Sequence, residues 1–311
     1  MSYKIIYCGT PDFAIPPLNS LIKDKDFQIQ FVISQPDKKF GRKQEFKPTD
    51  VKKFAVENAL KVLQPEKIEE IKDEIKEADP DVLVVVAYGQ KIPESILKIP
   101  KFGCINIHAS LLPKYRGATP IQSALLNGET ETGITIFKLV EKLDAGDIIS
   151  MKKIPIKDED TSETLFEKIS DTSGEFLIDT LKKYLDKEIV PVPQEESDAT
   201  FCHKIKREDG LIKFKLETSS KIFNKYRAFT PWPGIFTHFN NKRLKLLEIK
   251  ASDENIETEK GKTVQTSDNK LAVQCMEGSI LIEKLQLEGK KPQNITEFLK
   301  GNSDIINYSF E

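Results

Sequence analysis

Apolar residues in the first part of the chain form short runs that alternate with amphipathic stretches. The runs at 4–8, 28–34, 62–63, 81–88, 104–108, 135–140 and 148–156 are typical of strands, and 81–88 is almost continuously apolar, as in a parallel strand covered on both faces. Segments 12–23, 66–77 and 161–187 instead place their apolar residues at helical spacing. Strands alternating with helices predict an α/β domain over residues 1–189, with a doubly wound, mostly parallel sheet.

The pattern changes after residues 190–206, which contain two prolines and a polar run and which we interpret as a linker. Residues 207–311 then combine a helix at 219–227 with short strands at 236–239, 243–249, 262–266, 271–275 and 280–287. Several short strands separated by polar turns predict a small β-barrel. A chain of 311 residues is also long enough for two domains.

Charge changes this picture only when it is followed along the chain. The composition is that of an ordinary globular protein, and a formal net charge of −2 does not indicate a polyanionic partner. Residues 204–250, however, hold twelve Lys or Arg against four Asp or Glu, which favours contact with nucleic-acid phosphates. Residues 35–53 are also rich in Lys and Arg, although such a run is more often a solvated loop.

Cysteine use and the lack of long apolar stretches bear on the cellular compartment. Cys8, Cys104, Cys202 and Cys275 are far apart and form no CxxC pair, so we expect reduced thiols, a cytoplasmic location and no metal site. The first strand-like run begins at Tyr3, and no apolar stretch approaches the roughly 20 residues that span a bilayer. We therefore expect neither a targeting peptide nor a membrane segment.

Asn106, His108 and Asp144 are the strongest candidates for catalysis. Asn106 and His108 occupy alternate positions of the run 104–108, so they project from the same face of the predicted strand. Polar groups on an apolar strand cost free energy unless they have partners or a task. A lone histidine in this setting is more often structural than catalytic, but the neighbouring amide and the downstream carboxylate favour a site.

Other polar positions have weaker signals. Gly9 lies between the first strand and a helix, where backbone amides often meet a ligand, but GxGxxG is absent and a plain β–α turn remains the alternative. Arg116 lies in a loop stiffened by prolines, which favours an anionic ligand, whereas the alternative is a structural loop before the helix that begins at Pro120. Trp232 lies between two prolines and is predicted to be buried at a rigid corner.

These motifs together resemble those of the folate-dependent formyltransferases. The resemblance rests on NIHASLLPKYRGATPI at 106–121, GTPDFA at 9–14, QPDK at 35–38 and PWPG at 231–234. The motifs occur in order over nearly the whole chain, and together they resemble the members of the family that act on methionyl-tRNA. The resemblance implies a Rossmann-like formyltransferase domain followed by an OB-like domain that binds tRNA.

The resemblance also implies a reaction. A formyl group would pass from 10-formyltetrahydrofolate, a co-substrate, to the α-amino group of methionine on initiator methionyl-tRNA, in translation initiation. Asn106 and a protonated His108 would donate hydrogen bonds to the developing oxyanion, and Asp144 would orient His108 and raise its pKa. A water molecule would carry the proton. No metal is implied, and we expect a monomer.

Contacts for both substrates follow from the same resemblance. The implied folate-binding residues are Tyr88, Gly89, Gln90, Ser110, Leu111, Leu112, Pro113, Gly146 and Asp147. The implied contacts to the acceptor end and the rest of the tRNA are Gly9, Thr10, Pro11, Phe13, Lys38, Arg42, Lys43, Arg116, Lys204, Lys206 and Arg207. The chain departs from the family where Lys43-Gln44-Glu45 replaces an expected glycine and two lysines, which puts individual contacts of that loop in doubt.

Three alternatives use the same residues. Another folate-dependent formyltransferase, acting on an amino-sugar nucleotide or glycinamide ribonucleotide, would share the Asn/His/Asp set. A formyl-folate hydrolase would replace the amine with water, and a non-catalytic RNA-binding protein would have lost the chemistry. The basic segments favour tRNA as the substrate, and the intact set of three polar groups argues against loss of catalysis.

Overall fold

The computed structural model describes residues 2–40 and 45–311, which form two compact units. The first unit comprises residues up to Pro120, Glu131–Pro155 and Phe166–Cys202. The second comprises Ile121–Thr130, Ile156–Leu165 and the residues from His203 onward. Each unit is therefore built from three separate stretches of sequence, and residues 190–202 belong to the first unit.

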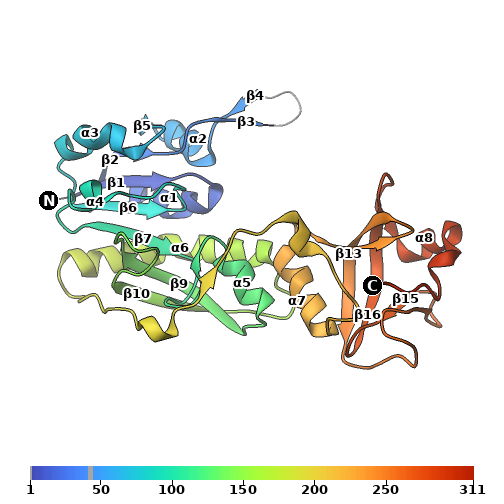
Figure 1. Ribbon diagram of the computed structural model, residues 1–311. Coiled ribbons are helices and arrows are strands. Elements are labelled where there is room, and N and C mark those ends of the chain that lie inside the picture. The colour runs from blue at the N-terminus through green and yellow to red at the C-terminus, as the bar shows by residue number, and fades with distance from the viewer. Residues whose placement is uncertain (1, 41–44) are drawn as a thin grey trace. The chain divides into compact units, whose positions relative to one another are not determined.

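A seven-stranded sheet forms the centre of the first unit, and its elements follow one another across Figure 1. Its strand order is β10-β9-β7-β6-β1-β2-β5. The strands are β1 (Tyr3–Gly9), β2 (Phe27–Ile33), β5 (Val62–Leu63), β6 (Val82–Val86), β7 (Cys104–His108), β9 (Glu131–Lys138) and β10 (Ile148–Pro155). The five strands from β5 to β7 are parallel, whereas β9 is antiparallel to both of its neighbours. The prediction of a mostly parallel sheet is confirmed, and the chain reverses its direction of winding between β1 and β6.

The first unit also contains several helices, most of them in the connections between these strands. They are η1 (Asp12–Ala14), α1 (Ile15–Lys23), α2 (Asp50–Glu57), η2 (Ile68–Ile71), α3 (Lys72–Glu77), α4 (Glu94–Leu97), η3 (Glu196–Asp198) and most of α6 (Ser162–Leu185). Helix α6 approaches α1 closely at Gly174, where a Cβ atom would lie 2.9 Å from the Pro16 carbonyl oxygen. Two short ribbons complete the unit: β3 (Lys38–Phe40) with β4 (Glu45–Lys47), and β8 (Arg116–Gly117) with β11 (Phe201–Cys202).

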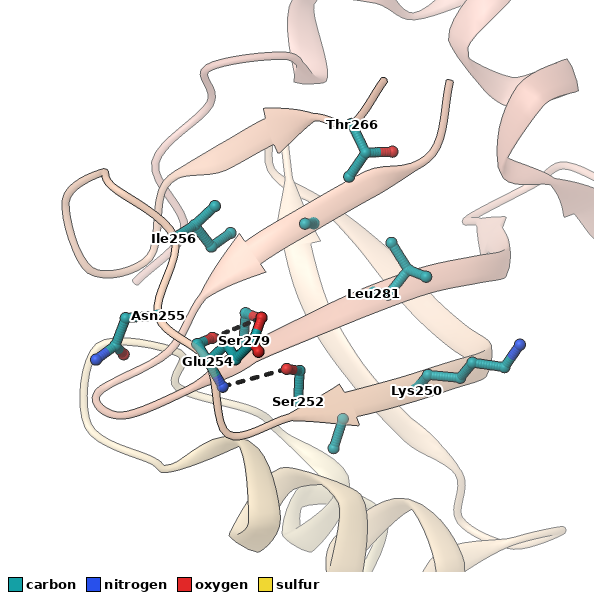
Figure 2. Close-up of a pocket in the computed structure, with 10 residues that line it drawn as sticks. Lys250, Ser252, Glu254, Asn255, Ile256, Thr266, Ser279 and Leu281 are labelled. Atoms are coloured by element: carbon teal, nitrogen blue, oxygen red, sulfur yellow. Dashed lines mark hydrogen bonds between the residues drawn. The ribbon is translucent and has the colours of Figure 1, made fainter. Parts of the chain in front are cut away.

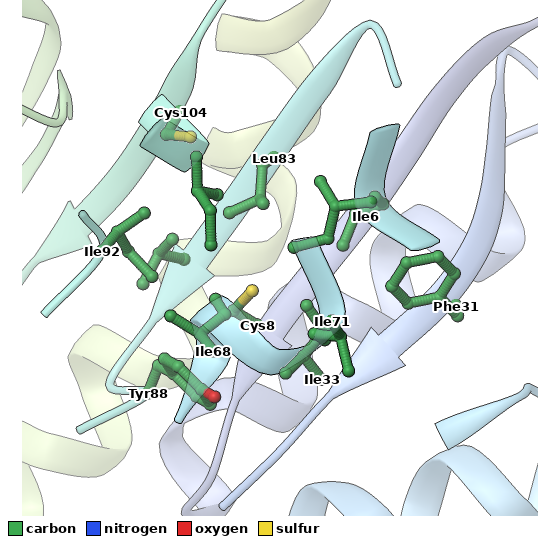
Figure 3. Packing of buried hydrophobic residues seen from close by; sticks show 13 residues of the cluster. Ile6, Cys8, Phe31, Ile33, Ile68, Ile71, Leu83, Tyr88, Ile92 and Cys104 are labelled. Atoms are coloured by element: carbon green, nitrogen blue, oxygen red, sulfur yellow. The ribbon is translucent and has the colours of Figure 1, made fainter. Parts of the chain in front are cut away.

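One face of the sheet is covered by the cluster of buried side chains in Figure 3. Alternate residues of β1, β2 and β6 enter this cluster, and Ile68, Ile71 and Ile75 of η2 and α3 cover them. Leu83 pairs with Cys104 and Val85 pairs with Asn106 in the β6–β7 ladder. Because paired residues of neighbouring strands share a face, the period of two carries Asn106 and His108 onto this same covered face.

The second unit is built on an antiparallel sheet of order β12-β13-β16-β15-β14, with β17 paired to β16. The strands are β12 (Ile235–Phe239), β13 (Lys242–Ser252), β14 (Thr263–Gln265), β15 (Leu271–Gln274), β16 (Ser279–Leu287) and β17 (Gln293–Asn294). The helices are α5 (Pro120–Leu126), η4 (Arg207–Gly210), α7 (Ser219–Phe229), α8 (Ile295–Gly301) and η5 (Ser303–Ile305). The predicted succession of short strands after a helix is confirmed.

Trp232 corrects one sequence expectation about this unit. The corner at 231–234 is closed by the backbone, since the Gly234 N–H donates to the Phe229 carbonyl at 2.8 Å. The turn therefore needs no buried side chain to hold it. Trp232 is 54% exposed, so the prediction that it is buried is wrong.

A shallow pocket of about 320 Å³ lies on this sheet, between β13, β15 and β16 (Figure 2). Its polar groups bond to one another: the Glu254 N–H donates to Ser252 Oγ at 3.2 Å, and Ser279 Oγ donates to the Glu254 carbonyl at 3.0 Å. These bonds hold the turn after β13. None of the residues expected to bind substrate lines this pocket.

Within residues 2–40 and 45–311, none of the helices combines the length and apolar character that crossing a bilayer requires.

Candidate active site

Two loops meet at the reversal point of the sheet, where open α/β sheets bind their ligands. One follows β1 and contains Gly9 and Thr10, and the other follows β6 and contains Tyr88 and Gly89. The Thr10 hydroxyl donates to the Tyr88 carbonyl at 2.7 Å, which joins the two loops. Gly9 has no room for a side chain, because a Cβ atom would lie 2.8 Å from Cβ of Ala14. The structure thus brings the expected acceptor loop and the expected folate loop together.

The side chains around these loops are largely committed to the fold. Phe13 is buried against Phe166, with ring centroids 5.1 Å apart, while Pro11 is half-buried. The Gln90 amide accepts from the Ile68 N–H at 2.9 Å and donates to the Glu66 carbonyl at 3.1 Å. Tyr88 is buried, and burial raises the pKa of its hydroxyl. The backbone of this loop is therefore what remains for a ligand.

His108 ends β7 with both ring nitrogens directed at acceptors. The ring is 6% exposed, and Nε2 bonds to the Tyr115 carbonyl at 2.9 Å. Because a carbonyl oxygen only accepts, Nε2 must carry the hydrogen, and the neutral ring has its lone pair on Nδ1. Nδ1 lies 3.9 Å from Oδ2 of Asp144, which exceeds hydrogen-bonding distance. The nitrogen that can take up a proton therefore faces a carboxylate.

Asp144 reaches this position because its loop folds back over the sheet. Strand β9 ends at Lys138, near Ile105, whereas His108 pairs with Thr135 further along the ladder. The loop is tightly turned: Asp144 has a φ of 48°, a region that costs free energy for a non-glycine residue. The next turn needs Gly146, whose Cβ would lie 1.8 Å from the Lys138 carbonyl oxygen. The Gly117 N–H then fixes the carboxylate by donating to Oδ2 at 2.8 Å.

Asn106 lies two residues before His108 on the same face of β7. Its side chain is half-buried, and no group among the described residues hydrogen-bonds to its amide. An uncommitted amide beside a histidine and a carboxylate can donate to an oxygen that develops negative charge. The structure therefore brings together the three groups that the sequence singled out.

The protonation state of His108 differs from the sequence expectation. Burial lowers the pKa of the imidazole more than the Asp144 carboxylate and the Tyr115 carbonyl raise it, so the net pKa lies below its ordinary value of 6.5. The prediction that Asp144 raises the pKa of His108 is right for that interaction and wrong for the net direction. His108 is accordingly neutral near pH 7 and is a proton acceptor before it is a donor.

Arg116 does not lie on an exposed basic surface. Its side chain is fully buried, with 0% exposure. The guanidinium donates to Oε1 of Gln194 from Nε at 3.1 Å and from Nη2 at 2.9 Å, and Nη1 donates to the Glu196 carboxylate at 3.0 Å. These bonds and those of Lys142 hold the pKa of Glu196 below its usual range. The burial of Arg116 argues against a direct contact with tRNA.

The segment 110–113 forms a wall beside β9. Thr135 is fully buried, and its hydroxyl donates to the Ser110 carbonyl at 2.6 Å and accepts from the Leu112 N–H at 3.1 Å. The Pro113 carbonyl accepts from the Thr200 N–H at 3.2 Å. Leu111 lies against Gly133, where there is no space for a side chain. This wall and the Gly146–Asp147 turn belong to the same loops that surround His108.

Basic residues expected to contact tRNA fall into three groups. Arg42 and Lys43 lie outside the described residues. Lys38 is exposed in β3, directly opposite Lys47 of β4. Lys204, Lys206 and Arg207 are all exposed near the start of the second unit's long segment.

Several residues of this neighbourhood gave no signal in the sequence. Gln194, Glu196 and Thr200 lie in the polar stretch interpreted as a linker, and they contact residues about 80 positions earlier. Nothing in their spacing indicates these partners. Thr135 did offer a signal, because it is a polar residue in an apolar strand and pairs with His108 between β9 and β7.

Protonation of His108 predicts how stability depends on pH. The unfolded state binds a proton near pH 6.5, whereas the folded state does so only at a lower pH, so the unfolded state binds more protons between the two values. The free energy of unfolding therefore does not depend on His108 protonation above pH 6.5, and it decreases as the pH falls below 6.5. Urea unfolding between pH 5 and 8 should show this decline, and His108→Gln should flatten it. An equal decline in both proteins would contradict the assignment.

Comparison with known proteins identifies the family of the chain. Residues 3–181 match the formyl transferase family, and residues 204–303 match the formyl transferase C-terminal domain. The chain is 44% identical over 301 residues to a methionyl-tRNA formyltransferase of Enterococcus faecalis, covering 96% of each protein. It is 39% identical to that of Malacoplasma penetrans, over 97% of this chain and 94% of the relative.

Solved structures show the same fold at lower identity. An N-formyltransferase from Helicobacter canadensis, in complex with folinic acid and dTDP-3-aminofucose, has a TM-score of 0.68 at 20% identity, over 91% of this chain and 99% of that one. HypX from Aquifex aeolicus, in complex with tetrahydrofolic acid, has a TM-score of 0.62 at 15% identity, over 96% of this chain and 47% of that one. On the strength of its full-length relatives, this chain belongs to the methionyl-tRNA formyltransferases of the formyl transferase family.

Proposed function

We propose that the chain transfers the formyl group of 10-formyltetrahydrofolate to the α-amino group of methionine on initiator methionyl-tRNA. The observation that carries the proposal is the meeting of Asn106, His108 and Asp144 beside the loops at the reversal point of the sheet. Full-length identity to methionyl-tRNA formyltransferases favours this acceptor over amino-sugar nucleotides and over water.

The chemistry starts when the amine attacks the formyl carbon, and the carbonyl oxygen then takes up the negative charge. The amide of Asn106 is free to donate a hydrogen bond to that oxygen. The attacking nitrogen must lose a proton, and Nδ1 of neutral His108 is the acceptor, directly or through a water molecule. When the bond between the formyl carbon and N10 of the folate breaks, N10 receives this proton from His108, and the cycle ends with a neutral imidazole.

Asp144 lowers the energy of the state in between. Protonated His108 would donate from Nε2 to the Tyr115 carbonyl and face the Asp144 carboxylate with Nδ1, 3.9 Å away. Burial makes the imidazolium unfavourable at rest, whereas the carboxylate limits that cost once the proton has arrived. The ring is thereby suited to take a proton and give it up again within one turnover.

The donor fits the backbone-lined part of the site. The side chains of Tyr88 and Gln90 are turned into the protein, so the loop offers amide and carbonyl groups to a flat heterocycle rich in donors and acceptors. Tetrahydrofolic acid in the HypX structure and folinic acid in that of the Helicobacter canadensis enzyme support a folate as the donor here.

Two basic surfaces support tRNA as the acceptor. Lys38 and Lys47 face each other across the β3–β4 ribbon, and Lys47 also lies 3.9 Å from Asp50. Like charges in opposite positions are unfavourable, and an added anion would reduce that cost. In the segment 204–250, Arg227 is buried and Lys225 pairs with Glu217, but most of the other basic side chains are exposed. Phosphate contacts would draw on these exposed cations.

Removing the opposed lysines should weaken tRNA binding and leave the folate site intact. For Lys38→Ala combined with Lys47→Ala, we expect a several-fold higher KM for methionyl-tRNA and a KM for 10-formyltetrahydrofolate within about twofold of the wild type. The slope of log K against log salt should become shallower by about one to two, because up to two phosphate contacts are lost. Lys98→Ala, on an exposed pair with Glu94, is the matched control. An unchanged salt slope would show that this ribbon does not touch RNA.

The proposed function itself is tested by following the formyl group. Purified protein and 10-formyltetrahydrofolate are incubated separately with initiator methionyl-tRNA, with elongator methionyl-tRNA, with an amino-sugar nucleotide and with no acceptor. Formylmethionine released from the initiator tRNA supports the proposal. Formate release without acceptor, or transfer to the sugar nucleotide alone, would contradict it.

A further inference from the structure

We infer that Gln194 is a positioning residue for formyl transfer, which holds the Asp144 loop and Arg116 and through them the groups that contact both nitrogens of His108. The inference rests on the proposed function, and it concerns a residue of the segment 190–202, which belongs to the first unit.

Both the nitrogen and the oxygen of the Gln194 carboxamide form hydrogen bonds within the protein. Its Nε2 donates to the carbonyl oxygens of Asp144 and Gly146, both at 2.8 Å. Its Oε1 accepts from two nitrogens of Arg116, at 3.1 and 2.9 Å. One side chain therefore ties the turn that carries the carboxylate to the strand β8. The two bonds to carbonyls also stabilise a turn in which Asp144 adopts a left-handed backbone conformation.

Arg116 depends on these contacts because it is fully buried. A guanidinium out of water requires acceptors for its hydrogens, and among the described residues these are Gln194 and the carboxylate of Glu196. The backbone around it is fixed by the same segment: the Tyr115 N–H donates to Oγ1 of Thr200, and the Arg116 N–H donates to the Thr200 carbonyl, both at 2.8 Å.

Residues 115–117 in turn determine the surroundings of His108. The Tyr115 carbonyl accepts from Nε2, and the Gly117 N–H holds Oδ2 of Asp144, which faces Nδ1. Gln194 thus acts on the imidazole from two directions. It hydrogen-bonds to the backbone of Asp144, and it hydrogen-bonds to the side chain of Arg116, which lies between the two residues that supply these contacts, Tyr115 and Gly117. Loss of its hydrogen bonds should loosen the carboxylate while leaving the sheet and its core in place.

The test compares two substitutions at this position with a neighbour. Gln194→Met keeps the volume and removes every hydrogen bond. Gln194→Glu keeps an oxygen for the buried Arg116 and replaces the donor to Asp144 and Gly146 with a charged oxygen that repels their carbonyl oxygens. It remains informative if the methionine variant fails to fold. Glu195→Gln is the control, because Glu195 is exposed and its carboxylate accepts only from Ser197 among the described residues.

Three quantities are measured for each protein: kcat and KM for both substrates, the thermal midpoint, and the pKa of His108 by NMR. The chain has three histidines, so His108→Gln identifies the resonance. We expect kcat to fall by about 10- to 10²-fold in both Gln194 variants, with each KM within about threefold of the wild type, because misplacement of a reacting group affects the transition state. In Gln194→Met the pKa of His108 should fall further, since the carboxylate that raises it is no longer held.

The outcomes are distinguishable. If the thermal midpoint falls while kcat and the pKa of His108 stay at wild-type values, Gln194 is only structural and the inference is wrong. Wild-type kcat in both variants would also overturn it. Failure of the wild type to formylate methionyl-tRNA would instead contradict the proposed function, and the dependence of the His108 titration on Gln194 would still be measurable in the free protein.

Discussion

Replacing His108 with alanine is expected to lower kcat for formyl transfer by about 10²–10⁴-fold, the range typical of a general acid–base residue. The imidazole faces Asp144, its lone pair is on Nδ1, and its lowered pKa keeps it neutral at pH 7. Without it, water must take the proton from the attacking amine. The KM for each substrate should change little, because the ring is buried and gives little to ground-state binding.

The measurement is the initial rate of formylmethionyl-tRNA formation at saturating donor and acceptor. His238→Ala is a suitable control, because His238 is an exposed histidine on β12, in the second unit. Its rate should equal that of the wild type. A kcat for His108→Ala within a few-fold of the wild type would show that another group moves the proton.

Replacing Asp144 with asparagine should cost nearly as much, about 10²–10³-fold in kcat. Asparagine has the same shape and can still accept the Gly117 N–H, so the loop should keep its conformation. What disappears is the charge facing Nδ1, which stabilises the ring after it has taken the proton. The pKa of His108, already lowered by burial, should fall further, and the acidic limb of the rate profile should move to lower pH.

This prediction is checked by kcat as a function of pH, with Glu141→Gln as the control from the same loop. Glu141 is exposed and pairs with Lys91 at 3.2 Å. Because His108 and Asp144 act as one unit, the double variant His108→Ala, Asp144→Asn should be little slower than His108→Ala alone. If the loss of kcat in the double variant equals the product of the two single losses, the carboxylate acts independently of the ring.

The sheet could be predicted because its strands coincide with short apolar runs in the sequence. Strand β7 has the predicted bounds, and the period of two placed Asn106 and His108 on one face correctly. The ribbon at 38–47 and helix α2 were not predicted, because this polar stretch has no apolar period. Thr49 was an available signal for the helix, since its hydroxyl caps α2 by accepting from the Lys52 N–H.

The site could be predicted only in part. Nothing local indicates that the loop with Asp144 returns across the face of the sheet, and that expectation came from the resemblance to a family. Arg116 was expected to meet an anion, and the anion it meets is Glu196 of its own chain, in a segment without periodic apolar residues. The direction of the His108 pKa shift also depends on how deeply the ring is buried. The sequence pointed to the nearby charge of Asp144 but not to the burial of the imidazole.

The partners of Arg116 bear on where the catalytic half of this protein ends. A polypeptide cut after residue 189 would retain all seven strands of the main sheet and the whole of the long helix α6. It would lack Gln194, Glu196 and strand β11, and so would leave a guanidinium without acceptors in the interior. Shortened versions intended for folate-binding or inhibitor work should therefore extend at least to Cys202, because the residues that contact buried Arg116 come well after the last strand of the main sheet.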